Sequence, residues 1–338
     1  MKIGMLTGGG DCPGLNAVIR AVVRKGIFTY GGQFVGFMEG WRGVIEDESM
    51  PLDLDTVGGI LPRGGTILRT SRTNPSKRHD GIDRCVASLE KNGIEALIAI
   101  GGDDTLSVAQ KLHERGVKVI GVPKTIDNDL SATDVTFGFD TALHTVTDAI
   151  DKIHTTAASH HRVMVVEVMG RDCGWIALEA GIAGGAHIIL IPEIPFTLNR
   201  VCEQIGEREK VGRRFTIVVV AEGVKLPPEL KENRRASTVG NLIGNAIATG
   251  ANKEVRISVL GHIQRGGSPS PFDRILATRF GVAAVDLIAA GGFGMMVALR
   301  GESIVSVDVA HVIGHLKSVD PHGEMVRTAR SIGIGFGD

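Results

Sequence analysis

The sequence predicts an α/β protein in which mostly parallel sheets are covered by helices on both faces. Short apolar runs at 94–100, 117–122, 163–168 and 216–221 have the length of buried strands. Apolar residues between the first two runs recur at helical spacing, and such short connections require a right-handed parallel crossover. The 46 glycines, about twice the usual share, suit many tight strand-to-helix turns. The 338 residues are enough for two domains of ordinary size.

The composition excludes several classes of protein. A net charge of −1, with 11 Phe, 2 Trp and 1 Tyr, argues against a dedicated nucleic-acid binder. No apolar run approaches the ~20 residues that span a bilayer, and residues 3–6 look like a strand instead of a signal peptide. The four cysteines are scattered, which indicates reduced thiols without zinc or disulfides. We therefore expect a cytoplasmic protein with neither a membrane nor a nucleic acid as partner.

Residues 2–6 are expected to form a buried strand, and 7–14 (TGGGDCPG) the turn into a helix. A dinucleotide site is one interpretation, but the spacing of Gly8, Gly10 and Gly14 misses G-x-G-x-x-G by one residue. The turn also lacks the Gly-Lys-Ser/Thr of a Walker motif. A generic phosphate-facing turn is the prediction.

A second strand is expected at 34–37, followed by a glycine-rich basic loop at 63–72 (RGGTILRTSR). Its glycines and Arg72 are typical of a loop that lies over bound phosphates. A solvated surface loop is the alternative.

The central stretch, 94–129, is predicted to form strand, helix and strand, and ligands of such sheets bind beyond the carboxyl ends of the strands. Two polar tips should therefore lie side by side, 101–105 (GGDDT) and 124–129 (KTIDND).

The first tip has the chemistry of a phosphate and Mg2+ site, because glycine backbone and a helix N-terminus favour anions. Asp103 can hold Mg2+, which prefers one or two carboxylates plus phosphate oxygens. A helix N-cap is the alternative for this residue.

In the second tip, Asp127 and Asp129 suit a general base for an alcohol and a residue that orients the acceptor. A solvated turn is the alternative there.

The second half should continue the same pattern. We expect a helix at 141–156, a strand at 163–168 that places Arg171 at its carboxyl end, a helix at 176–183, and strands at 188–191 and 216–221. Arg162, Arg171, Arg256 and Arg265 each adjoin a strand or a Gly turn, and guanidinium groups suit a sugar phosphate. The charged stretch 226–235 is expected to be an exposed connection, and the glycine-rich end 332–338 to fray.

Four motifs in order resemble the phosphofructokinase family: 123–129 (PKTIDND), 169–174 (MGRDCG), 221–223 (AEG) and 260–267 (LGHIQRGG). The similarity extends from the first strand to about residue 300. It implies two three-layer Rossmann-like domains with the active site in the cleft between them. The implied domains are 1–138 plus 265–304 for the phosphoryl donor and 139–264 plus 305–338 for the sugar phosphate.

The resemblance implies phosphoryl transfer to the 1-hydroxyl of fructose 6-phosphate, giving fructose 1,6-bisphosphate in glycolysis. Asp127 would take the hydroxyl proton, Thr125 and Asp129 would orient the acceptor, and Arg171 would stabilise the moving phosphoryl group. The implied donor-binding residues are Gly10, Arg72, Gly102, Asp104 and Lys124, with Mg2+ on Asp103. The implied acceptor-binding residues are Thr125, Asp127, Asp129, Arg162, Met169, Gly170, Arg171, Glu222, Arg256, His262 and Arg265. In this family Arg162 and Arg256 would come from a neighbouring subunit, so a homodimer or homotetramer with shared active sites is expected.

The donor is predicted from departures within the family pattern. ATP-using relatives usually carry Gly at position 104, and many carry Gly at 124. This chain has Asp104 and Lys124, the pair that marks users of pyrophosphate, although some ATP-dependent relatives also carry Lys at 124. Arg69 likewise stands where glycine is usual. An ATP-dependent phosphofructokinase, an NAD or lipid kinase with the same Gly-Gly-Asp-x-Thr turn, and a non-catalytic sugar-phosphate-binding subunit are the alternatives.

Overall fold

The computed structural model describes residues 1–231 and 237–338, and these divide into two units. The first unit contains Met1–Ile126, Leu130–Thr141 and Arg265–Leu316. The second contains Asp127–Asp129, Ala142–Gln264 and Lys317–Asp338. Neither unit is one continuous segment, because the chain passes repeatedly from one to the other.

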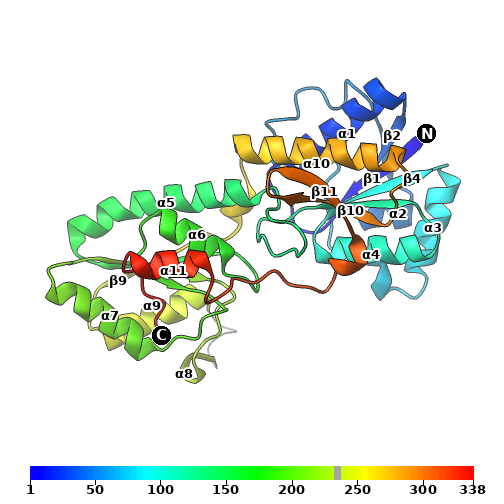
Figure 1. The fold of residues 1–338 in the computed structure, drawn as a ribbon. Coiled ribbons are helices and arrows are strands. Elements are labelled where there is room, and N and C mark those ends of the chain that lie inside the picture. The colour runs from blue at the N-terminus through cyan, green and yellow to red at the C-terminus, as the bar shows by residue number, and fades with distance from the viewer. Residues whose placement is uncertain (232–236) are drawn as a thin grey trace. The chain divides into compact units, whose positions relative to one another are not determined.

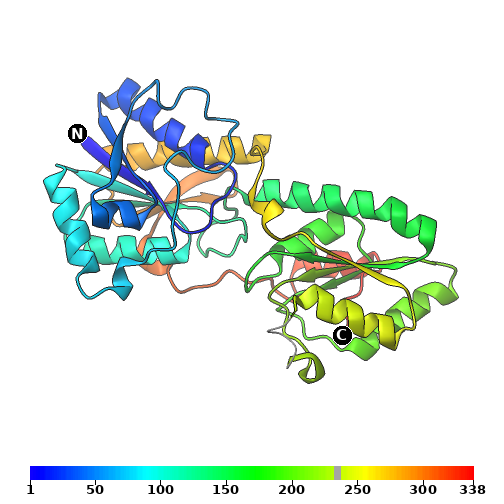
Figure 2. The same ribbon diagram turned by 180° about the vertical axis from the view of Figure 1, so that it is seen from behind.

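The first unit is built on a seven-stranded sheet whose central strands are parallel and whose two edge strands are antiparallel. In spatial order the strands are β11 (Ser303–Asp308), β10 (Met295–Arg300), β5 (Val119–Pro123), β4 (Ala96–Gly101), β1 (Lys2–Thr7), β2 (Gln33–Phe37) and β3 (Ser49–Leu52). Helices cover both faces. Figures 1 and 2 show α1 (Leu15–Tyr30) and α10 (Pro271–Ala289) on one face, and α3 (Gly81–Lys91) and α4 (Asp103–Glu114) on the other. The shorter elements are α2 (Trp41–Glu46), η1 (Pro75–Lys77) and η4 (Val309–His311).

The predicted strand, helix and strand at the centre of the chain are confirmed as β4, α4 and β5. Every residue of β4 and β5 is buried, as expected for strands covered on both faces. Helix α4 turns Leu106, Val108, Ala109 and Leu112 into the core, and all four are fully buried. Burial of each large apolar side chain contributes roughly 1.5–3 kcal/mol, so the apolar run and the helical period together hold this crossover on the sheet.

The second unit has a four-stranded parallel sheet. Its strands, in spatial order, are β7 (Ile188–Leu190), β8 (Thr216–Ala221), β6 (Val163–Val168) and β9 (Val255–Val259). Figures 1 and 2 show α5 (Phe139–His160) and α6 (Trp175–Ala183) on one face, and α7 (Leu198–Lys210) and α9 (Val239–Gly250) on the other. The remaining elements are α8 (Pro228–Lys231), η3 (Gly261–Arg265) and α11 (Glu324–Ser331). None of the helices in the described ranges has the length and apolar character needed to span a bilayer.

The division into units differs from the expected one near the C-terminus. The expectation assigned 305–338 to the second domain, but β11 pairs with β10 in the first sheet, and the change of unit falls between Leu316 and Lys317. Residues Asp127–Asp129 also belong to the second unit, an excursion that was not expected.

One expectation about an irregular segment is wrong, and another holds only in part. The C-terminal segment does not fray: Ile189 N donates to Gly335 O at 2.9 Å, Gly335 N donates to His187 O at 3.0 Å, and Phe336 is fully buried. The stretch 226–235 is not simply an exposed connection, because Leu226 is buried and α8 follows it. Residues 232–235 of that stretch lie outside the described residues.

Candidate active site

The glycine turn after β1 carries two cationic side chains on its backbone. Lys124 Nζ donates a hydrogen bond to the Gly10 carbonyl. Arg265 Nη1 donates to the Asp11 carbonyl at 3.3 Å. A turn with a positive dipole end behind it and two cations beside it suits an anion, as the sequence predicted for a phosphate-facing turn.

The second turn of the first unit leads from β4 into α4. The helix begins at Asp103, and its N-cap residue Gly102 has no side chain to cap it. Asp103 is therefore not the N-cap, and its Oδ1 atom accepts a hydrogen bond from Gly314 N at 2.7 Å. Asp104 follows in the first turn and is exposed. The capping alternative does not account for either carboxylate.

The first residues of the two polar tips, Gly101 and Lys124, lie side by side in the first unit, as predicted. β4 and β5 are parallel neighbours with Gly101 opposite Pro123, and Lys124 N donates to Gly101 O at 3.0 Å. The Lys124 and Thr125 side chains are only 3% and 8% exposed. Thr136 Oγ1 donates to the Thr125 carbonyl at 2.8 Å, which fixes the backbone just before the acidic residues.

The acidic tip of the second unit is buried, so it is not a solvated turn. Asp127 is 6% exposed and Asn128 is 3% exposed. Asn128 has a left-handed φ of 52°, and its Oδ1 atom accepts from Lys317 Nζ at 3.2 Å. Lys317 N donates to the Asp129 carbonyl at 2.9 Å. These contacts order the tip within the second unit.

Arg171 and Glu222 are brought together at the carboxyl ends of neighbouring strands. β6 and β8 pair with Val168 opposite Ala221, and Arg171 N donates to Glu222 Oε1 at 3.1 Å. Gly170 has a φ of 137°, and a Cβ atom there would lie 2.5 Å from Cys173 O, so this position requires glycine. Arg171 itself has a φ of 55°, a strained conformation of the kind that gathers at functional sites.

The pKa of Cys173 shows that carboxylates lie near the loop at 169–173. Burial, and to a smaller extent the nearby carboxylates of Asp129, Glu193 and Asp127, raise the pKa of the Cys173 thiol to about 12. Asp127 and Asp129 therefore lie close enough to the 169–173 loop to repel a negative charge there. Arg171 is an exposed cation in the same loop.

Arg162 and Arg256 are not brought to that site within one chain. Arg162 immediately precedes β6, and Arg256 is the second residue of β9, so both lie at the amino ends of parallel strands. Both pair with Glu254, at 2.9 Å and 2.5 Å. Met169 is seven residues beyond Arg162, which corresponds to roughly 20 Å of extended chain.

The remaining predicted residues are Met169, His262 and Arg72. Met169 is nearly buried at the end of β6, whereas His262 in η3 is exposed. Arg72 is exposed and makes no side-chain ion pair or hydrogen bond to any residue that the structure describes.

Gln264 is a positioning residue that the sequence analysis missed. It is fully buried, its Oε1 atom accepts from Met169 N at 3.2 Å, and its Nε2 atom donates to Gly261 O at 3.0 Å. A polar residue inside the motif at 260–267 was the available signal.

The side chains that could bind a metal ion here suit a weakly held Mg2+ better than a site made of protein ligands alone. Within residues 1–231 and 237–338 no group of three His, Cys, Asp or Glu side chains could hold a metal ion. Asp103 uses one carboxylate oxygen for Gly314 N, while the turn beside it suits phosphate. Mg2+ can be bound through one carboxylate, phosphate oxygens and water, so Asp103 and a bound phosphate would be sufficient to hold it.

Comparisons with known proteins indicate the family of this chain. The family model described as Phosphofructokinase matches residues 2–288. A pyrophosphate–fructose 6-phosphate 1-phosphotransferase of Streptomyces coelicolor is 56% identical over 349 residues, covering 100% of both chains. An ATP-dependent 6-phosphofructokinase 2 of Clostridium perfringens is 51% identical, covering 100% of this chain and 98% of its own.

Solved structures show the same fold. The phosphofructokinase of Pichia pastoris in the T-state has a TM-score of 0.84 and 34% identity, and the match covers 92% of this chain and 35% of that longer chain. A pyrophosphate-dependent phosphofructokinase from Nitrosospira multiformis has a TM-score of 0.86 at 21% identity, over 100% of this chain and 92% of its own. Together with the match at residues 2–288 and full-length relatives above 50% identity, these findings establish that the chain belongs to the phosphofructokinase family.

Proposed function

We propose that this phosphofructokinase uses pyrophosphate to phosphorylate the 1-hydroxyl of fructose 6-phosphate, a reversible step of glycolysis. The observation that carries the donor assignment is Asp104, an exposed carboxylate in the first turn of α4, beside the strand end that presents Lys124. A carboxylate there repels the additional phosphate of a nucleotide, whereas pyrophosphate has no such group. Lys124 adds an ammonium group next to the Gly10 carbonyl.

Donor-side residues occupy the first unit. Gly10 and Gly102 offer backbone to the phosphates, and Arg72 and Lys124 offer positive charge. Asp103 would hold Mg2+, which neutralises charge on the donor phosphates when bound. The hydrogen bond from Gly314 N to one oxygen of the Asp103 carboxylate fixes the orientation of that carboxylate.

Acceptor-side residues follow β5 of the first sheet and β6 and β8 of the second. Asp127 accepts the proton of the 1-hydroxyl, while Asp129 and the preceding Thr125 orient the sugar. Arg171 stabilises the phosphoryl group in transfer, because a planar guanidinium matches its oxygens. Met169, Gly170 and Glu222 hold the sugar, and Glu222 also fixes Arg171 through the 3.1 Å bond to its backbone N–H.

Binding of the sugar and its 6-phosphate is assigned to Arg162, Arg256, His262 and Arg265. Arg162 and Arg256 lie at the opposite strand ends from Arg171, so we propose that a partner subunit supplies them to each site. A homodimer or homotetramer satisfies this requirement.

We further propose a cytoplasmic location, in keeping with four free cysteines, of which three are buried.

ATP-dependent phosphofructokinase is the second candidate, because relatives with that name are 51% and 53% identical to this chain. The deciding experiment measures turnover of fructose 6-phosphate with pyrophosphate and, separately, with ATP. We expect a kcat/KM at least tenfold higher with pyrophosphate. Efficient turnover with ATP and none with pyrophosphate would overturn the donor assignment, and phosphorylation of NAD without turnover of fructose 6-phosphate would overturn the acceptor.

A further inference from the structure

The loop at 63–72 is fixed directly onto the glycine turn. Thr7 Oγ1 donates to the Arg69 carbonyl at 2.8 Å, and Thr70 Oγ1 donates to the Gly9 carbonyl at 2.6 Å. Gly9 N donates to the Ser71 carbonyl at 3.3 Å. These bonds place the backbone of Arg69 at the carboxyl end of β1, next to the residues assigned to the donor.

Arg69 has a backbone conformation that favours glycine. Its φ is 56°, in the left-handed region where a side chain clashes with the backbone. Its side chain does not compensate through packing, since it is 74% exposed and pairs with Glu39 only at 3.9 Å. An arginine in a strained backbone conformation, whose side chain makes only this loose ion pair, points to a role in binding.

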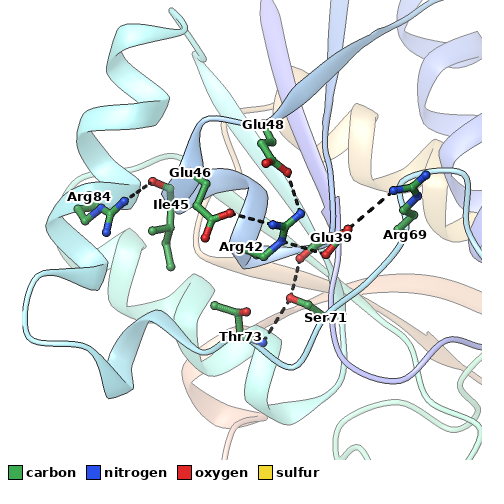
Figure 3. Close-up of polar contacts among 9 residues, drawn as sticks. All are labelled: Glu39, Arg42, Ile45, Glu46, Glu48, Arg69, Ser71, Thr73 and Arg84. Carbon is green, nitrogen blue, oxygen red and sulfur yellow. Dashed lines mark hydrogen bonds and ion pairs between the residues drawn. The ribbon is translucent and has the colours of Figure 1, made fainter.

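Glu39 belongs to a polar network that holds the loop (Figure 3). Leu68 O accepts from Glu39 N at 2.8 Å, and Ser71 Oγ donates to Glu39 O at 2.7 Å. The Glu39 carboxylate is bound to Arg42 Nε at 2.9 Å, and Arg42 is itself held by Glu46 and Glu48 at 2.9 and 2.8 Å. Glu39 is thus anchored by Arg42, while Arg69 keeps a loose pairing that a stronger anion can replace.

We propose that Arg69 is a donor-binding residue that contacts a phosphate of pyrophosphate, and that Glu39 positions it. The inference rests on the proposed function. Pyrophosphate has no base or ribose, so all of its affinity comes from groups that bind phosphate oxygens. Arg69 adds a guanidinium to the cations of Arg72 and Lys124, and charge-assisted hydrogen bonds are the strongest contacts available to such a ligand.

The test compares Arg69→Gly, Arg69→Lys and the control Arg115→Ala with the unmodified protein. Arg115 is an exposed residue of the same unit that pairs with Asp83 at 2.7 Å and lies outside the loop. Arg69→Gly should raise the KM for pyrophosphate roughly tenfold, the effect of one charge-assisted hydrogen bond, and leave the KM for fructose 6-phosphate unchanged. Its thermal midpoint should be unchanged or higher, because glycine removes the strain at this φ.

Arg69→Lys should keep a KM for pyrophosphate close to that of the unmodified protein, and Arg115→Ala should match it in every measurement. An unchanged pyrophosphate KM in Arg69→Gly, or a KM in Arg69→Lys as high as in Arg69→Gly, would overturn the role of Arg69. An unmodified protein that turns over fructose 6-phosphate with ATP alone would instead overturn the proposed donor. The two failures are therefore distinguishable.

Discussion

At the scale of single residues, Asp127 is the side chain on which the chemistry should depend most. It is buried at the start of the short excursion into the second unit, two residues beyond Thr125. We expect Asp127→Ala to lower kcat by about 10^2- to 10^4-fold, as removal of a general base does, while fructose 6-phosphate still binds. Steady-state turnover and equilibrium binding of the sugar phosphate check this. Asp148→Ala, which removes an exposed carboxylate, is the matched control, and a loss of kcat under tenfold would show that another group takes the proton.

Asp104 and Lys124 allow a test of donor choice by substitution. Two like charges ~4 Å apart repel by about 1 kcal/mol in water and about 4 kcal/mol at an effective dielectric constant of 20, and the exposure of Asp104 favours the lower value. Asp104→Gly should therefore gain measurable turnover with ATP, at least severalfold above the unmodified protein. Adding Lys124→Gly should lower kcat/KM for pyrophosphate further. If Asp104→Gly uses ATP no better than its parent, the carboxylate does not select the donor.

Asp273 should make the stability of the protein depend on pH. It is fully buried in α10, where its Oδ2 atom accepts from Thr141 N at 2.8 Å, and burial raises its pKa to about 6. Because this pKa lies above the reference value of 3.8, the folded state keeps a proton that the unfolded state releases. The free energy of unfolding should therefore fall as pH rises from about 4 to about 6, by at most about 3 kcal/mol. Asp273→Asn should lack this component in urea unfolding between pH 4 and 8, and parallel curves for the two proteins would contradict it.

At the scale of elements, the C-terminal segment acts as an additional edge on the second sheet. Gly335 forms a parallel bridge with Ile188 of β7, and Phe336 is fully buried beside the Arg330 guanidinium, 4.8 Å from its ring. Phe336→Ala should destabilise the protein by about 3–5 kcal/mol, because it leaves a cavity. Thermal or urea unfolding measures this, with the 65% exposed Ile332→Ala as control. Equal midpoints for the two variants would mean that the segment contributes no core.

The sequence predicted best those elements that carry their own periodicity. β4, α4 and β5 have apolar runs and a helical repeat, so both their type and the position of Lys124 beside Gly101 could be predicted. The segment 332–338 has no such pattern, and its order comes from hydrogen bonds to His187 and Ile189, far away in the sequence. Tertiary contacts of this kind leave no local signal. Gln264 lies inside the motif at 260–267, but its role depends on the distant Met169 N–H from which it accepts, so the motif alone did not reveal that role.

At the scale of the whole molecule, each unit collects residues from separate parts of the chain. The hairpin of β10 and β11 belongs to the first sheet, and Lys317 begins the return to the second unit, where it binds Asn128. The motifs alone could place Arg171 at a strand end. Arg171 lies beside Glu222 because β6 and β8 are parallel neighbours. The motifs could not place the crossings, because those depend on which strands pair across long stretches of sequence.

The positions of Arg162 and Arg256 lead to the last prediction. Both lie at the amino ends of β6 and β9, whereas Arg171 follows the carboxyl end of β6, so one chain does not gather them into a single site. If a partner supplies the two arginines, Arg162→Ala and Asp127→Ala should each be inactive alone. Denaturing, mixing and refolding them together should restore about a quarter of the normal activity in a twofold dimer, because half the dimers are hybrids with one intact site. Turnover of the refolded mixture measures this, and differently tagged hybrids purified from it should reach about half of the normal activity, because one of their two sites is intact. Hybrids shown to form, yet without activity, would contradict a shared site.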